Sequence, residues 1–216
     1  MLYTLFGLKI LLGDMTKFWR LILLVVCTTE TSCVFAEGVP FPSVSTNISP
    51  NKLWEIRSEQ DKKNDGAYSL ILRNRKTGVE RRIFSGDRWC EVLWAAGDDK
   101  IAITDWLGSD SSEILLQNTS QEERAKPLAD AAARAFLTKD ELVGHCYWEA
   151  LKWESGGQLR IRVFGHTDEN PGHEFVYEFI FDPNKKSAIL VKKDGGPDSR
   201  AEQRIWADKE KAWKKR

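Results

Sequence analysis

From residue 52 onward the chain alternates short apolar runs with polar turns. Runs of about four to eight residues bounded by Gly, Asn, Asp or Pro are typical of strands in an antiparallel β protein. Turns such as Asn64-Asp-Gly66 and Ser155-Gly-Gly157 separate consecutive runs, so we expect most strands to pair with their sequence neighbours. The predicted strands span residues 52–58, 67–74, 79–84, 89–95, 100–105, 113–117, 147–153, 159–165, 174–182 and 187–192.

Two segments have helical rather than strand patterns. Residues 122–144 form an insert with an alanine-rich run, and Pro127 stands where a first helical turn begins. Thr138 and Glu141 have the spacing of a capping box, so we expect two short helices in this insert. Residues 194–216 form a Gly-Gly-Pro loop and then a helix with sparse apolar positions. This pattern favours a loosely docked or partly disordered tail.

Residues 1–36 contain two short apolar runs separated by charged residues. Neither run reaches the ~20 apolar residues of a spanning helix, whereas a basic start, the run 21–27 and the small residue Ala36 match a secretory signal peptide. Met15 is an alternative start, and a lipid-modified Cys27 or a retained anchor are the alternatives to cleavage. We therefore predict a periplasmic or secreted protein without a membrane span after signal cleavage.

The remaining chain has the size and charge of one ordinary globular domain. Residues 37–51 are rich in Pro, Ser and Thr without periodicity, which indicates an extended leader, and residues 52–193 form the predicted β domain. The 32 basic and 32 acidic residues balance. Nucleic-acid-binding proteins carry an excess of basic residues, so this balance argues against that class of protein.

A weak internal repeat surrounds three tryptophans. Each copy has an apolar residue near a Trp, then a Gly- or Asp-containing turn, then a strand of period two. The copies are Leu53-Trp54-Glu55-Ile56 with Tyr68-Ser-Leu70, Val92-Leu-Trp94 with Ile101-Ala-Ile103, and Leu151-Lys-Trp153 with Leu159-Arg-Ile161.

These copies resemble the repeats of TolB-type periplasmic β-propellers over about half of the predicted mature chain. The chain departs from that family at Ala96-Gly97 and Ser155-Gly156, which stand where Pro precedes the turn Asp. Ten strands also do not fill the roughly four blades of four strands that a closed propeller needs. The resemblance implies a mainly β protein with propeller-like local structure, arranged as an incomplete ring, a sandwich or an open antiparallel meander.

Cys90 and Cys146 are the cysteines of the predicted mature chain. In an oxidising compartment two cysteines favour one disulfide, and the alternative is two buried thiols that pack as small apolar groups. Strand alternation places Cys90 on the face of Trp94 and Cys146 on the face opposite Trp153. This argues against the disulfide unless a bulge or loop precedes Tyr147.

Two polar loops carry candidate ligands. His166, Asp168 and His173 lie close in sequence, and imidazoles with carboxylates suit zinc or another divalent ion. Asp105 and Asp110 lie in a hairpin loop whose oxygen atoms suit calcium. Neither spacing matches an established motif, so an ordinary solvated turn is the alternative in both loops. The sequence carries no cofactor signature, and we expect no cofactor.

Nine tryptophans are enough to build both a core and a binding surface. Trp54, Trp94 and Trp153 occupy equivalent repeat positions beside apolar strands, which indicates packing between sheets. Trp106 follows a strand in a polar loop, and Trp148 alternates to the face opposite Trp153. We therefore predict Trp106 and Trp148 as surface residues that bind a partner.

The sequence lacks the nucleophile elbow, zinc-protease, phosphate-loop and dinucleotide signatures of common enzyme classes. We predict an exported bacterial binding or envelope-interaction module with a protein or glycan partner, bound by Trp106 and Trp148 together with Asp105 and Asp110. Two other classes stay open. One is a secreted hydrolase that uses the loop carboxylates, and the other is a structural subunit that forms oligomers through exposed sheet edges.

Overall fold

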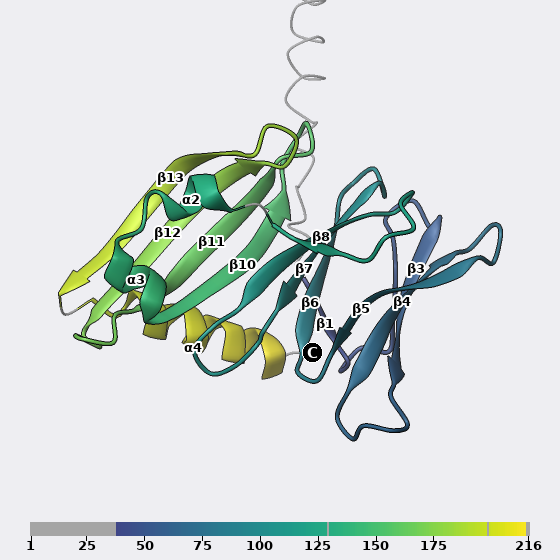
Figure 1. Cartoon of the computed structure of the whole chain (residues 1–216), viewed down its shortest axis with the longest axis horizontal. Helices are drawn as coiled ribbons and strands as arrows, with labels where there is room; N and C mark the ends of the chain where they lie inside the picture. Colours follow the sequence, from purple (N-terminus) through teal and green to yellow (C-terminus); the bar gives the residue numbers. More distant parts are fainter. Residues whose placement is uncertain (1–37, 129, 198, 215–216) are drawn as a thin grey trace, which may run out of the picture. The chain divides into compact units, whose positions relative to one another are not determined.

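A computed structural model describes residues 38–128, 130–197 and 199–214. Within these ranges the chain forms thirteen strands and three helices (Figure 1). None of these helices is long and apolar enough to cross a membrane. The predicted signal peptide, residues 1–36, lies outside the described residues.

The strands form three antiparallel sheets in which most neighbours are consecutive in sequence, which confirms the predicted fold class. The first sheet contains β2 (Thr46–Ile48), β3 (Trp54–Gln60), β4 (Tyr68–Asn74) and β5 (Glu80–Gly86). The second sheet contains β1 (Val39–Phe41), β6 (Cys90–Trp94), β7 (Lys100–Asp105), β8 (Glu113–Asn118) and β9 (Lys126–Pro127). The third sheet contains β10 (His145–Trp153), β11 (Leu159–His166), β12 (His173–Asp182) and β13 (Ser187–Pro197).

Side-chain alternation in the second sheet explains how the sheets pack. In β6, Val92 belongs to the core shared with the first sheet, whereas Leu93 belongs to the core shared with the third sheet. In β7, Ile103 belongs to the core shared with the first sheet and Ala102 to the core shared with the third sheet. Because both faces of the second sheet are apolar, it lies between the other two sheets with a core on each side (Figure 1).

The three repeat tryptophans pack in these cores, as predicted. Trp54 and Trp94 belong to the core between the first and second sheets, and Trp153 to the core between the second and third sheets. The indole N–H of Trp94 donates to the side chain of Asn47 at 2.6 Å, and that of Trp153 to the Leu93 carbonyl at 3.2 Å. Both polar tips therefore keep a hydrogen-bond partner inside the protein.

The predicted leader, residues 37–51, takes part in the fold. Its two strands join different sheets, since β1 pairs with β6 and β2 pairs with β3. Phe41 in β1 is fully buried between the first and second sheets. Strands of three residues are too short to show a period of two, so pattern alone does not reveal them.

The helical insert contains α2 (Ala131–Arg134) and α3 (Lys139–Val143). The predicted capping box is confirmed, because Thr138 accepts a hydrogen bond from the Glu141 N–H at 3.2 Å and the Glu141 carboxylate accepts one from the Thr138 N–H at 2.7 Å. The prediction that Pro127 opens a helix is wrong. Pro127 ends the edge strand β9 opposite Leu115, a position where a missing N–H is tolerated.

The C-terminal helix α4 (Ala201–Lys214) is packed against the domain, which corrects the expectation of a loose tail. Its residue Ile205 is buried with Tyr147 and Phe164 on the face of the third sheet that is turned away from the second sheet, called here the outer face. The loop predicted at 194–197 is instead the end of β13, where Gly195 at φ +124° lies against the Phe175 backbone.

Candidate binding site

A cluster of aromatic rings forms where α4 meets the outer face of the third sheet. Trp106 lies at its centre and is only 2% exposed, so the predicted surface position of this residue is wrong. Its ring stacks on Trp89 at a centroid distance of 4.7 Å and lies 5.3 Å from Trp206 of α4. Tyr147 and Phe164 contact it from the sheet at 6.1 and 6.5 Å. Trp106 is therefore a buried support for its neighbours.

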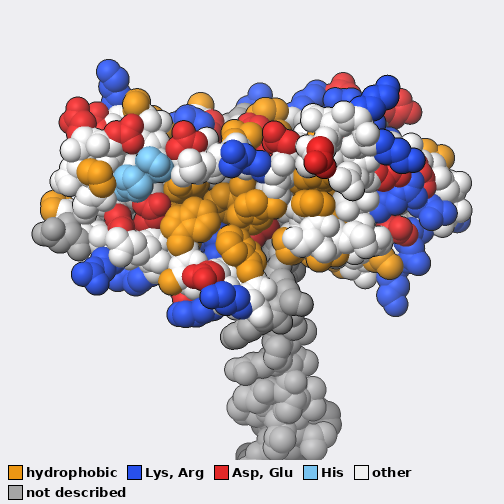
Figure 2. Space-filling view, turned by 90° about the horizontal axis from the view of Figure 1, so that it is seen from below, with side chains coloured by type: hydrophobic (Ala, Val, Ile, Leu, Met, Phe, Trp, Pro, Cys, Tyr) orange, Lys and Arg blue, Asp and Glu red, His pale blue; other side chains and the backbone are white. Residues whose placement is uncertain are grey.

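A pocket of about 610 Å³ opens beside this cluster, and it is lined by Pro40, Ser43, Val44, Trp89 and Trp213. Trp213 is 36% exposed and meets Trp89 edge to face at a centroid distance of 4.7 Å. Figure 2 shows apolar side chains gathered across the middle of the face seen from below. Since Trp89 is stacked on buried Trp106, one wall of the pocket is fixed by the core.

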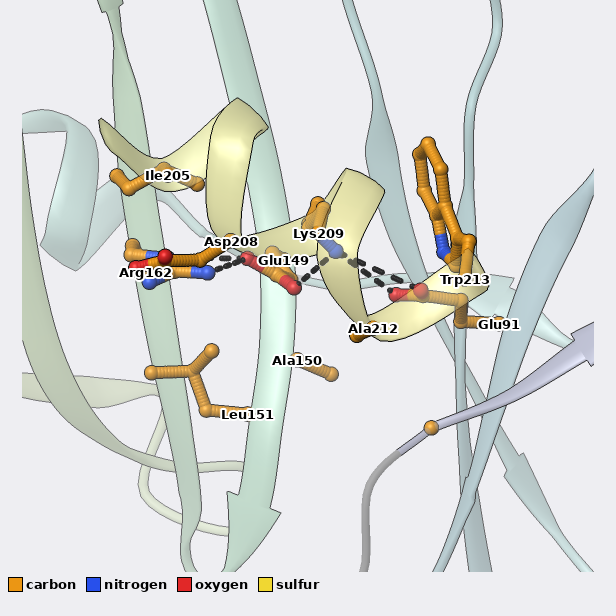
Figure 3. A pocket seen from close by; sticks show the side chains of 11 residues that line it. Glu91, Glu149, Ala150, Leu151, Arg162, Ile205, Asp208, Lys209, Ala212 and Trp213 are labelled. Carbon is orange, nitrogen blue, oxygen red and sulfur yellow. Dashed lines mark hydrogen bonds and ion pairs between the residues drawn. The ribbon is translucent and has the colours of Figure 1, made fainter. Parts of the chain in front are cut away.

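A buried ion network fixes α4 beside the pocket (Figure 3). The Lys209 ammonium lies 2.5 Å from Glu149 of β10 and 3.3 Å from Glu91 of β6, and Arg162 of β11 lies 2.5 Å from the other oxygen of Glu149. These groups border a second hollow of about 260 Å³. Lys209 thereby ties the helix to two sheets. Trp213 stands one helical turn further on, so the same contacts orient its ring.

Trp148 was predicted at the surface and is buried, with only 4% of the residue exposed. The physical reason is a β-bulge between Ala150 and Lys152, which inserts one residue and shifts the alternation of β10. Trp148 and Trp153 therefore face the same core between the second and third sheets. The guanidinium of Arg134 lies 5.0 Å from the Trp148 ring centroid. This tryptophan is a packing residue.

Asp105 and Asp110 have different surroundings and do not form a site with the two tryptophans. Asp105 is buried opposite Cys90 in the second sheet, and burial raises the pKa of its carboxyl to about 6, with the negative charge of Glu113 adding to the rise. Asp110 is exposed, and its backbone carbonyl accepts a hydrogen bond from the Cys146 N–H at 3.0 Å. The predicted grouping of these carboxylates with the aromatic rings is therefore wrong.

Cys90 and Cys146 are both free and buried, so the structure holds no disulfide between them. Cys90 packs in the core between the first and second sheets, and Cys146 packs in the core between the second and third sheets. Because the second sheet separates the two cores, the alternative of two buried apolar thiols applies.

The predicted metal set of His166, Asp168 and His173 does not converge. His166 pairs across the strands with Glu174, and because side chains alternate, His173 points to the opposite face of β12. The residue directly opposite His166 on its other side is His145, and the two imidazole rings stack with centroids 4.2 Å apart. Among the described residues no three His, Cys, Asp or Glu side chains are placed to hold a metal ion together.

Trp89, Trp213 and the segment that contains Pro40 were not predicted to form a site. One signal was present, because Lys209 and Trp213 are four residues apart and share one helical face. Pro40, Ser43 and Val44 come from a segment without periodicity. They reach Trp89 only because β1 of this segment pairs with β6.

The chain matches no protein-family model, and a comparison with curated proteins gave no match. Among solved structures it is similar to an acylaminoacyl peptidase from Pyrococcus horikoshii (orthorhombic crystal form), with 11% sequence identity and a TM-score of 0.37. The alignment covers 67% of this chain and 23% of the peptidase chain. At this TM-score the likeness carries no argument about fold or function.

Proposed function

We propose that this chain is an exported binding module of the bacterial cell envelope that holds an apolar segment of a partner protein. The observation that carries the proposal is the pocket between Trp89 and Trp213. Both rings are held in place from inside, Trp89 by stacking on Trp106 and Trp213 by the helix that Lys209 anchors. A pocket that is ordered before binding lowers the entropic cost of association.

The chemistry of the lining favours a protein segment over a glycan. Pro40, Val44 and the two indole rings offer apolar surface, and Ser43 supplies the one hydroxyl side chain of this lining. Sugars require several directed hydrogen bonds beside an aromatic ring, whereas an apolar or proline-containing peptide segment gains affinity from ring contacts alone. Tryptophans at the centre of an interface also carry a large share of binding energy.

Site-specific photo-crosslinking in cells that produce the full chain tests this proposal. A photoreactive amino acid at Val44 is expected to crosslink one protein partner, and Trp213→Ala in the same chain is expected to abolish that product. The matched control places the photoreactive group at Ile189 of β13, which is 62% exposed on another part of the described surface. No partner-specific product at Val44, or a product that Trp213→Ala leaves unchanged, would contradict the pocket as the binding site.

A glycan ligand would give a different pattern. It would leave no protein crosslink at Val44, and a labelled envelope glycan would bind the unmodified protein and lose affinity in Trp213→Ala. That outcome would keep the pocket and overturn the protein partner.

A further inference from the structure

A third hollow, of about 260 Å³, lies between the second and third sheets where β8, β10 and β12 end. Trp153 and Phe181 line it from the third sheet. Gln117, Asn118 and Gln121 line it from β8 and the turn that follows. Its volume is just below the ~300–1,000 Å³ of sites for drug-sized ligands, so the hollow suits a small ligand of about one ring.

One wall of this hollow is aromatic and held in place from inside. Trp153 is partly buried against the core between the second and third sheets, and its indole N–H donates to the Leu93 carbonyl at 3.2 Å. Phe181 on the same wall is only 1% exposed. A ring that is already fixed presents apolar surface to a ligand at little conformational cost.

Another part of the lining consists of side-chain amides that the fold does not use. The amides of Asn118, Gln121 and Asn184 have no hydrogen-bond partner among the described residues. The neighbouring Gln117 is 3% exposed and donates to the backbone carbonyls of Asn118 at 2.5 Å and Gln121 at 3.4 Å, which holds this turn in place. An amide both donates and accepts hydrogen bonds, as the hydroxyl groups of a sugar do.

The charge of the lining is positive. Lys100 and Lys126 border the hollow, and no Asp or Glu does so among the described residues. Lys100 lies 4.0 Å from Asp99, and Lys126 pairs with Glu123, but both carboxylate side chains are 65% exposed. Ion pairs as exposed as these contribute little, so both ammonium groups remain available to an anionic ligand.

We propose that this hollow binds an acidic saccharide through one hexuronate ring. The C–H face of the ring packs on Trp153, its hydroxyls bond the side-chain amides, and its carboxylate pairs with the ammonium groups of Lys100 and Lys126. The Trp89–Trp213 pocket lacks such directed polar groups, so the saccharide and the apolar partner segment occupy separate sites. The proposal does not depend on that pocket or its partner.

Isothermal titration calorimetry of the full chain tests the site with the disaccharides of glucuronate, galacturonate and mannuronate, each beside its carboxyl-reduced form. At least one uronate disaccharide is expected to bind saturably and about 10-fold more tightly than its reduced form, because reduction removes the charge-assisted hydrogen bonds. Lys126→Gln is expected to weaken uronate binding about 10-fold, and Gln121→Ala about fivefold.

Lys211→Gln is the matched control, because Lys211 also forms an exposed i,i+3 ion pair but lies on α4. This variant and Trp213→Ala are expected to keep uronate affinity within about twofold. The second of these results separates the saccharide site from the aromatic pocket.

A measurement on the unmutated protein covers the case in which a variant fails to fold. The uronate disaccharide is expected to shift the side-chain amide NMR signals of Gln121 and Asn184 and to spare that of Asn64, which lies in the turn between β3 and β4. No saturable binding of any uronate, equal affinity for the carboxyl-reduced form, or equal effects of Lys126→Gln and Lys211→Gln would overturn the proposal.

Discussion

At the scale of single residues, burial controls the chemistry of the two cysteines. Burial raises the pKa of Cys90 to about 12 and that of Cys146 to about 11, so neither thiol ionises near neutral pH. Thiolates are the reactive form of cysteine. We expect iodoacetamide at pH 8 to leave both residues unmodified in the folded protein and to modify both in urea, as measured by peptide mass spectrometry. Rapid modification of the native protein would show that one of these cores opens.

Asp105 predicts a pH dependence of stability. Burial holds its pKa near 6 in the folded protein, above the value of 3.8 for a free side chain. The folded state therefore binds the proton more tightly, and this carboxyl adds stability as the pH falls from about 6 toward 4 and opposes folding when it is ionised. Asp105→Asn is expected to raise the free energy of unfolding at pH 7.5 by about 2 kcal/mol and to have little effect at pH 3.5.

The exposed Asp110 supplies the control for this comparison. Asp110→Asn is expected to change the free energy of unfolding by less than about 0.5 kcal/mol at either pH, as is usual for surface positions. Urea unfolding followed by circular dichroism measures both variants. A loss of stability in Asp105→Asn at pH 7.5 would mean that the ionised carboxylate stabilises the fold.

The directions of individual side chains were the hardest feature to predict. One inserted residue in the bulge of β10 reversed the face of Trp148, and no sequence pattern marks that bulge. The histidine pair depends on the same bulge. His145 lies ten residues before Ser155 and His166 lies nine residues after Gly157, so pairing the two strands by sequence alone places them one residue out of register, and the extra residue in β10 brings them opposite each other.

At the scale of secondary-structure elements, α4 depends on one buried ammonium. Lys209 contacts Glu149 and Glu91, which belong to two different sheets. Lys209→Met removes the cation and leaves the Glu149 carboxylate partly uncompensated in a buried site, which is expected to lower the free energy of unfolding by about 3 kcal/mol. Chemical denaturation measures the loss.

Lys211 on the same helix is the matched control, because it is exposed and forms an i,i+3 pair with Asp208. Lys211→Met is expected to change stability by less than about 0.5 kcal/mol. Equal effects of the two substitutions would show that the buried network does not hold the helix.

Strong local patterns explain which elements were predictable. The ten main strands could be predicted from their periodicity and from the turn residues that separate them. The capping box of α3 could be predicted from the spacing of two residues, Thr138 and Glu141. β1, β2 and β9 have two or three residues each, which is too short for a periodic pattern. They form because a neighbouring longer strand offers backbone hydrogen bonds. The docking of α4 escaped prediction for a related reason, since a large part of its attachment is polar and adds nothing to an apolar stripe.

At the scale of the whole described domain, the outer surfaces of the three-sheet stack are covered or charged over part of their area, while Ile189 of β13 is exposed. The outer face of the first sheet carries Arg57, which forms ion pairs with Glu59 and Glu80 at 2.7 Å. The outer face of the third sheet is covered in part by α4. The resemblance to TolB-type repeats stays a prediction about local structure.

The covering role of α4 predicts what its removal does to the domain. A chain that ends at Pro197 uncovers Tyr147, Phe164 and Val176, which α4 buries in the complete chain. Losing this apolar contact is expected to lower the free energy of unfolding by on the order of 5 kcal/mol, to raise the fluorescence of anilinonaphthalene sulfonate and to cause self-association seen by light scattering. A chain that ends at Lys211 keeps Ile205 and Lys209, so we expect it to show the same dye fluorescence and light scattering as the complete chain. If the chain ending at Pro197 matched the complete chain in stability, dye fluorescence and light scattering, α4 would be the loosely docked tail that its sparse apolar positions indicated.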